Sequence, residues 1–230
     1  DAATKEYIYI KGGIHTASAG MTGKPLAKTF DSSMIYNAAS GSKKGSSLEF
    51  TSLSGSTVEF WLKKDAFDTA KATKEVIFDF WNQEADSDAT HGRILLNVDS
   101  SNNFTLTWRS GSTTGNENIQ PAGLTVADGK WHHYAVSLKK AGSNMNIKFY
   151  QDGVLQNTKT NSNDIGNIKG LSSGLCATIG ALNTHPYGVG ALVRGDGKLS
   201  GSMDEFRYWK KELTPQDIGL NWFSQIGGGN

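Results

Sequence analysis

Hydrophobic and polar residues alternate with a period of two along much of this chain. Between residues 104 and 109, for example, Phe, Leu and Trp alternate with Thr, Thr and Arg. Successive side chains of a β-strand point to opposite faces, so this alternation predicts strands with one buried face. Strands are expected at residues 7–10, 58–63, 76–81, 94–98, 104–109, 134–138, 145–151, 175–179 and 200–209.

Turn-forming residues separate these segments. Polar residues at 100–103 and 141–144 each stand between two predicted strands. The pair Asp152-Gly153 predicts a hairpin, because glycine accepts the positive φ of a type I′ turn. Short strands joined by such turns predict an all-β fold, an antiparallel β-sandwich of two sheets.

One short helix is expected near the C-terminus. Thr214 suits the N-cap, and Pro215 suits the first helical position, where its missing N–H is not needed. Asp217 stands where a capping box places its acidic residue, and Leu213 and Ile218 occupy the positions of a hydrophobic staple. The helix is expected to cover one end of the sandwich.

The composition excludes several classes of function. The chain has 230 residues, of which 37% are hydrophobic, and this suits one large β-domain. We expect a single domain over residues 1–230, with a strand and loops in 1–46, the core in 47–218 and a tail in 219–230. A net charge of +1 favours no nucleic-acid partner. The chain contains no apolar run of roughly 18 residues, so the sequence does not predict insertion into a membrane. The single cysteine, Cys176, is expected to be a small buried hydrophobe.

Several segments together resemble one known family. Residues 128–156, DGKWHHYAVSLKKAGSNMNIKFYQDGVLQ, and residues 199–209, LSGSMDEFRYW, are similar to signatures of laminin-G-like, concanavalin A-like lectin/glucanase domains. The resemblance covers about residues 46–218 and implies a two-sheet antiparallel jelly roll with one short C-terminal helix. This fold hosts lectins, adhesion modules, glycosidases, lyases and virion proteins, so function has to be argued from sites.

The adjacent histidines of Trp131-His132-His133 suggest a metal or acid–base site at first sight. Neighbouring residues on a strand point to opposite faces, so the two imidazoles cannot easily bind one metal ion. Trp131 and His133 share one face, and His132 and Tyr134 share the other. We therefore interpret this stretch as a packing signature of the fold.

Carboxylates gather in the polar segment 82–93. Glu84, Asp86 and Asp88 are candidate Ca²⁺ ligands, because calcium takes several oxygen ligands from flexible loops. The alternative is an ordinary solvated loop. Their spacing differs from the Glu-x-Asp-x-x-Glu strand of family-16-type glucanases, so catalysis is disfavoured. The family resemblance also implies Asp204, on the last strand, as a candidate ligand of a structural Ca²⁺, while Glu205 and Arg207 can form an ion pair there.

Aromatic and polar residues near strand ends are candidates for glycan contact, because sugar rings stack on aromatic faces. The segments 81–93, 109–118 and 183–194 are read as loops that can converge on one rim. The alternative for each residue is ordinary packing or a solvated loop. The candidate ligand-binding residues are Trp81, Asp86, Asp88, Arg93, Trp108, His185, Tyr187 and Arg194.

These observations favour a non-catalytic carbohydrate-binding or adhesion module that acts outside the cell on a glycan or a cell-surface polysaccharide. A structural or decoration domain of a virion or another large assembly is the second hypothesis, with other subunits as partners. A glycosidase or polysaccharide lyase is the third, and none of the common nucleophile or metalloprotease motifs is present.

Overall fold

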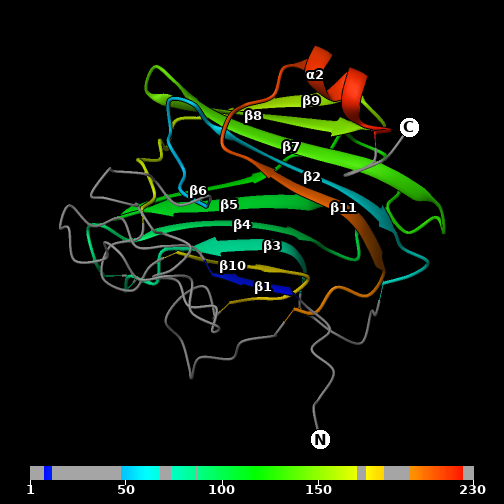
Figure 1. Cartoon of the computed structure of the whole chain (residues 1–230), viewed down its shortest axis with the longest axis horizontal. Coiled ribbons are helices and arrows are strands. Elements are labelled where there is room, and N and C mark those ends of the chain that lie inside the picture. The colour runs from blue at the N-terminus through cyan, green and yellow to red at the C-terminus, as the bar shows by residue number, and fades with distance from the viewer. Residues whose placement is uncertain are drawn as a thin grey trace, which may run out of the picture.

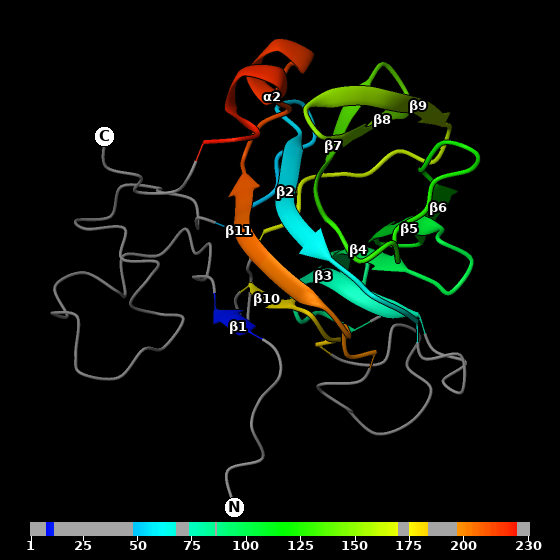
Figure 2. The same ribbon diagram turned by 90° about the vertical axis from the view of Figure 1, so that its right-hand side faces the viewer.

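The protein is a sandwich of two antiparallel sheets, seen edge-on in Figure 2. The computed structural model describes residues 8–11, 48–67, 74–85, 87–169, 175–183 and 197–224. One sheet has six strands in the order β1-β10-β3-β4-β5-β6, and the other has five in the order β11-β2-β7-β8-β9 (Figure 1). The predicted all-β jelly-roll architecture is confirmed.

The strands of the six-stranded sheet are β1 (Ile8–Lys11), β10 (Cys176–Ile179), β3 (Glu75–Trp81), β4 (Gly92–Val98), β5 (Phe104–Ser110) and β6 (Thr113–Asn118). The strands of the five-stranded sheet are β11 (Ser202–Trp209), β2 (Ser56–Lys63), β7 (Trp131–Ala141), β8 (Asn144–Gln151) and β9 (Val154–Asn161).

The inward faces of the two sheets form one hydrophobic core. Aromatic rings meet across the sandwich, with Phe104 of β5 packed 5.0 Å from Tyr134 of β7 and 5.2 Å from Phe149 of β8 between ring centroids. Phe60 of β2 joins the same group at 5.8 Å from Tyr134. Large aromatic side chains bury much apolar area, so this cluster contributes strongly to the stability of the fold.

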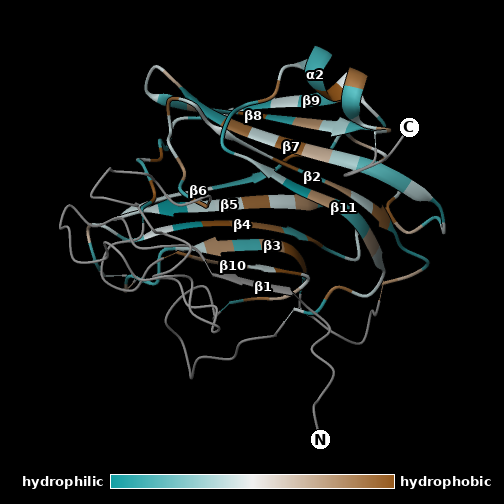
Figure 3. Cartoon of the chain, in the orientation of Figure 1, coloured by the Kyte–Doolittle hydropathy of each residue, from teal (hydrophilic) through white to brown (hydrophobic). Residues whose placement is uncertain are grey.

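One predicted loop is a strand. Residues 113–118, which the sequence placed in a loop, form β6 at the edge of the six-stranded sheet. They lack alternation because an edge strand can be polar on both faces (teal in Figure 3) and is held by its backbone ladder and by polar pairs such as Thr107–Asn116. Gly115 lies against the Trp108 ring, where a Cβ would come within 2.0 Å of Trp108 Cε2.

The predicted hairpin at 152–153 and the predicted helix are confirmed, but the helix lies on the outer face of the five-stranded sheet and not at one end of the sandwich. Asp152 and Gly153 have φ values of 50° and 78° at the turn between β8 and β9, as a type I′ turn requires. The helix α2 (Pro215–Asn221) begins after Thr214, whose side chain forms the capping box with Asp217. Leu213 and Ile218 are buried and pack together with Ala135 and Tyr150, which fixes α2 on the outer face of the five-stranded sheet.

Cys176 is buried, as predicted, and its thiol donates to the carbonyl of Trp81. No helix in the described part of the chain combines the length and the hydrophobicity that a membrane span needs.

Candidate functional site

Internal hydrogen bonds hold the acidic segment between β3 and β4 in a compact conformation. Asn82 Oδ1 accepts from the backbone N–H groups of Gly92 (3.0 Å) and Glu84 (3.3 Å), while Asn82 Nδ2 donates to Thr90 O (2.7 Å). His91 Nδ1 lies 2.9 Å from Glu84 O. Asp88 is exposed at the tip. The segment is therefore a compact loop whose polar side chains largely hold its own backbone.

Trp81 and Arg93 occupy paired positions in β3 and β4, and both have partners inside the protein. Trp81 is half-buried and its indole N–H donates to Glu84 O (3.2 Å). Arg93 is only 4% exposed, and its Nε and Nη2 donate to the two carboxylate oxygens of Asp79 at 2.9 and 2.6 Å. The prediction that Arg93 reaches a ligand is wrong, because burial and this bidentate pair hold the guanidinium within the sheet.

Trp108 is fully buried with an exposed fraction of 0%. Its indole N–H donates to Asn163 O at 2.9 Å, and its ring belongs to the main core. The prediction that Trp108 contacts a ligand is wrong. The alternation that places Phe104 and Leu106 inside places Trp108 inside as well.

The candidate metal ligands do not come together. In the part of the chain that the structure describes, no group of three or more His, Cys, Asp or Glu side chains is arranged to hold a metal ion. Glu84 and Asp88 follow β3 of one sheet, whereas Asp204 lies on β11 of the other. Asp86 lies outside the described residues. Calcium binding stays a prediction.

His185, Tyr187 and Arg194 lie outside the described residues, as does most of the segment 1–47, where the assembly hypothesis expects a terminal arm. One of the three loops that were expected to form a common rim is also not a loop, because residues 113–118 form the edge strand β6.

The two histidines of the packing signature lie on opposite faces of β7, as predicted. His132 Nδ1 lies 2.8 Å from Asp152 Oδ2, and its Nε2 lies 3.1 Å from Asp128 Oδ2. Asp152 Oδ1 also accepts from the backbone N–H of His133 (2.9 Å). This carboxylate thus joins the β8–β9 turn to the start of β7, which explains why the two motifs occur together.

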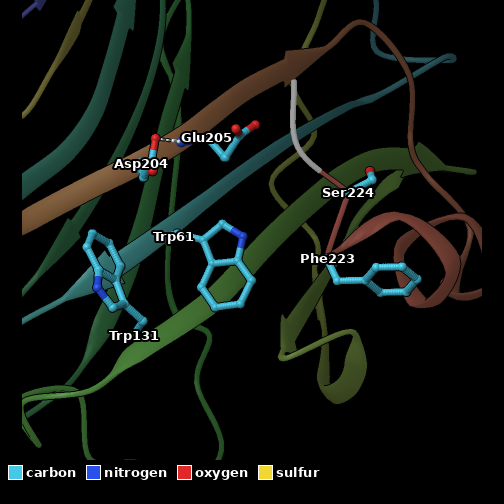
Figure 4. Close-up of a pocket in the computed structure, with 6 residues that line it drawn as sticks. All are labelled: Trp61, Trp131, Asp204, Glu205, Phe223 and Ser224. Atoms are coloured by element: carbon cyan, nitrogen blue, oxygen red, sulfur yellow. Dashed lines mark hydrogen bonds between the residues drawn. The ribbon is translucent and has the colours of Figure 1, made fainter. Parts of the chain in front are cut away.

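A pocket lies on the outer face of the five-stranded sheet (Figure 4). Its volume is about 270 Å³, and the residues that line it are Trp61, Trp131, Asp204, Glu205, Phe223 and Ser224. Trp131 is 44% exposed and Phe223 is 66% exposed, so both rings are accessible from solvent. Exposed aromatic side chains beside carboxylates are the chemistry of a ligand site.

Strand register builds this pocket from residues far apart in the sequence. Trp61 of β2 is paired with Asp204 of β11 on one side and with His133 of β7 on the other. Trp131 lies two residues before His133, so it shares that outer face. A bulge in β11 after Asp204 gives Glu205 a φ of 50°, and a bulge re-aims the side chains beside it.

Phe223 and Ser224 reach the pocket from the end of α2. The preceding residue, Trp222, packs 5.5 Å from the Trp61 ring and 6.2 Å from the His133 ring. Gly153 leaves the space for Trp222, since a Cβ there would lie 2.3 Å from Trp222 Cδ1. The C-terminal helix thus supports one wall of the pocket.

Polar groups are buried beneath these rings. Glu59 Oε2 accepts from the indole N–H of Trp209, and burial raises the pKa of Glu59, although this hydrogen bond and the charge of Arg207 oppose the shift. Burial, together with the charge of Arg207, lowers the pKa of His133 to about 4. Among the described residues, neither ring nitrogen of His133 has a hydrogen-bond partner, and His133 Nε2 lies 3.7 Å from Glu59 Oε1. His133 is therefore a neutral support at physiological pH.

Two residues of this pocket stand out in the sequence for other reasons, Asp204 and, as the expected partner of Arg207, Glu205. Asp204 was a candidate for calcium, and Trp131 was assigned to packing. The alternation that places Phe60 and Leu62 in the core places Trp61 on the outer face, and a tryptophan on a non-core face was the available signal. The meeting of Trp61 with Trp131 required the register of β2 and β7.

Comparisons with known proteins agree with this architecture. Residues 37–219 match the family model of the concanavalin A-like lectin/glucanases superfamily. A search of the curated proteins gave no match.

Several solved structures are similar at low identity. A heptameric SAP-like pentraxin from Limulus polyphemus is 16% identical, with 77% of this chain and 80% of that chain covered and a TM-score of 0.49. The CBM40 of the Ruminococcus gnavus IT-sialidase is 15% identical, with 74% and 83% covered and a TM-score of 0.47. The LG1-3 region of the laminin alpha2 chain is 14% identical, with a TM-score of 0.48, and 70% of this chain matches 28% of that chain.

Proposed function

Because the chain belongs to the concanavalin A-like lectin/glucanase superfamily, we propose that it is a non-catalytic carbohydrate-binding module whose glycan site is the pocket between β2, β7 and β11. The pocket of Trp61, Trp131, Asp204 and Glu205 is the observation that carries this proposal. We further propose that the protein acts outside the cell, on a glycan or a cell-surface polysaccharide.

The chemistry of the lining residues suits a sugar. The C–H face of a pyranose ring is apolar and packs on an indole, whereas its hydroxyl groups are donors that need acceptors. Carboxylates accept several hydrogen bonds, and bonds to an ionised acceptor are stronger than those between neutral groups. Two tryptophans with two acidic side chains thus match both surfaces of a sugar ring.

The pocket volume of about 270 Å³ lies near the lower end of the range for ligand sites. A site of this size accommodates a small part of a glycan chain. Affinity for a single such site is expected to be modest, because little of the ligand surface is buried.

Glycan-array binding followed by calorimetry on the best ligand tests the proposal. Trp131→Ala is expected to weaken binding roughly tenfold, since it removes one exposed stacking face. Its unfolding midpoint is expected to stay unchanged, because Trp131 is 44% exposed. Leu53→Ala, which truncates a side chain that is 70% exposed and does not line the pocket, serves as the control.

Three results would each contradict a part of this proposal. Loss of binding in Trp81→Ala with full binding in Trp131→Ala moves the site to the loop after β3. Absence of binding to any glycan, with and without EDTA, overturns the proposed function. Release of shorter products from a bound glycan contradicts the non-catalytic part of the proposal.

A further inference from the structure

The charged side chains that line the pocket are both acidic. Asp204 and Glu205 contribute carboxylates, and the remaining lining residues are three aromatic rings and one hydroxyl group. The stacking faces of the pocket suit a glycan in general, and its negative charge indicates which class of glycan it binds.

Arg207 does not neutralise the negative charge of the pocket. Arg207 Nη2 lies 3.1 Å from Glu205 Oε2, so its charge balances Glu205. The Arg207 guanidinium also donates to the carbonyl oxygens of Asn221 and Ser224, which hold it beside the end of α2. Arg207 is not among the lining residues.

Asp204 supplies the negative charge that remains. It is exposed, and its Oδ1 accepts from the backbone N–H of Glu205 (2.8 Å). The second carboxylate oxygen is not engaged by any residue that the structure describes, so it is available to a ligand. Lys63 shares this face of β2, opposite Trp131, but does not line the pocket.

The aromatic rings favour the same sign of charge. The face of an indole carries negative potential, so it attracts a cation that is held over it. Trp61 lies between Trp131 and Phe223, with Asp204 and Glu205 on the β11 side (Figure 4). A cation in this pocket therefore has aromatic rings and a carboxylate in the same lining.

We propose that this pocket prefers glycans that carry a protonated amine, that is, hexosamine residues whose nitrogen is not acetylated. The inference rests on the proposed function, and it names the class of sugar that the site takes. An N-acetyl group removes the positive charge. It also adds a carbonyl acceptor, which the carboxylates of Asp204 and Glu205 cannot satisfy because an ionised carboxylate has no hydrogen to donate.

The test compares two oligosaccharides of equal length and linkage, one of glucosamine and one of N-acetylglucosamine. Calorimetry with the full chain near pH 6, where an amine is protonated, measures both dissociation constants. We expect about tenfold tighter binding of the glucosamine oligomer, from one cation–π contact and one exposed ion pair. Equal or tighter binding of the acetylated oligomer overturns the inference.

Two matched variants identify the source of the preference. Asp204→Asn keeps the size of the side chain and removes its charge, and it is expected to weaken binding of the glucosamine oligomer roughly threefold more than binding of the acetylated oligomer. Lys63→Gln removes a nearby charge of the opposite sign and is expected not to weaken binding. An equal loss for both oligomers in Asp204→Asn contradicts the assigned role of this carboxylate.

Failure of this inference and failure of the proposed function are distinguishable. Binding of neutral or anionic glycans without binding of the glucosamine oligomer overturns the inference and leaves the proposed function standing. Absence of binding to every glycan overturns both. Binding of tetramethylammonium in the pocket without binding of the glucosamine oligomer shows a cation site for a ligand other than a sugar, and it also overturns the inference.

Discussion

The imidazoles of His132 and His133 lie on opposite faces of β7, and their pKa values move in opposite directions. His132 sits between the carboxylates of Asp152 and Asp128, at 2.8 and 3.1 Å. His133 is buried under Trp61 and Trp222, close to the charge of Arg207. The two neighbouring histidines thus lie in different environments, because successive side chains of a strand face opposite sides of the sheet.

His132 is expected to stabilise the fold mainly at acidic and neutral pH. Burial alone would lower its pKa, but hydrogen bonds and charges of Asp152 and Asp128 outweigh burial and raise the pKa above the ordinary 6.5. A pKa raised on folding gives stability that is present below the unfolded pKa and is lost as pH rises through the folded value. Titration of the His132 ring protons by NMR measures this, and a midpoint below 6.5 contradicts it.

His133 is expected to make the protein sensitive to acid. Its pKa of about 4 in the folded state means that the unfolded chain binds a proton first as pH falls. Stability is therefore lost between about pH 6.5 and pH 4, by roughly 3 kcal/mol if no other group compensates. Urea unfolding across this range measures the loss. His133→Asn is expected to flatten the pH dependence, and an unchanged slope in this variant argues against the assignment.

Asp152→Asn tests the carboxylate that joins the two motifs. The amide still accepts from the backbone N–H of His133 and tolerates the φ of 50°, so the substitution removes mainly the charge. We expect a loss of about 1 kcal/mol near pH 6, where His132 is charged, and a much smaller loss near pH 9. Urea unfolding at both values is the measurement. Equal losses at both would show that the His132 ion pair is not the cause.

Gly115→Ala is expected to destabilise the protein by about 2 kcal/mol, because the new Cβ would lie 2.0 Å from Trp108 Cε2 in the buried core. Gly219→Ala is the matched control. In α2 the added Cβ would lie 3.5 Å from Gly153 O, an ordinary contact, and alanine favours helix by roughly 0.5–1 kcal/mol. Thermal unfolding of both variants gives the comparison. A Gly115→Ala variant as stable as the native protein means that Trp108 does not occupy this position.

Local sequence signals determined the elements whose physics is local. Alternation placed Phe104, Leu106 and Trp108 on one face, and Asp152-Gly153 formed the predicted turn because few residues accept its φ values. The capping box of Thr214 and Asp217 likewise depends on residues three apart. The polar edge strand β6 was missed for the same reason, since its backbone ladder with β5 leaves no hydrophobic pattern in its side chains.

Only the tertiary structure decided which side chains meet. The sequence predicted that Asp204 and Trp131 lie on strands, but their meeting with Trp61 follows from the registers of β11 and β7 against β2. Those registers are set by packing both sheets around a common core, and a shift of one residue would turn Trp61 inward. The sequence by itself therefore determined the jelly roll, whereas long-range pairing between strands determined the pocket.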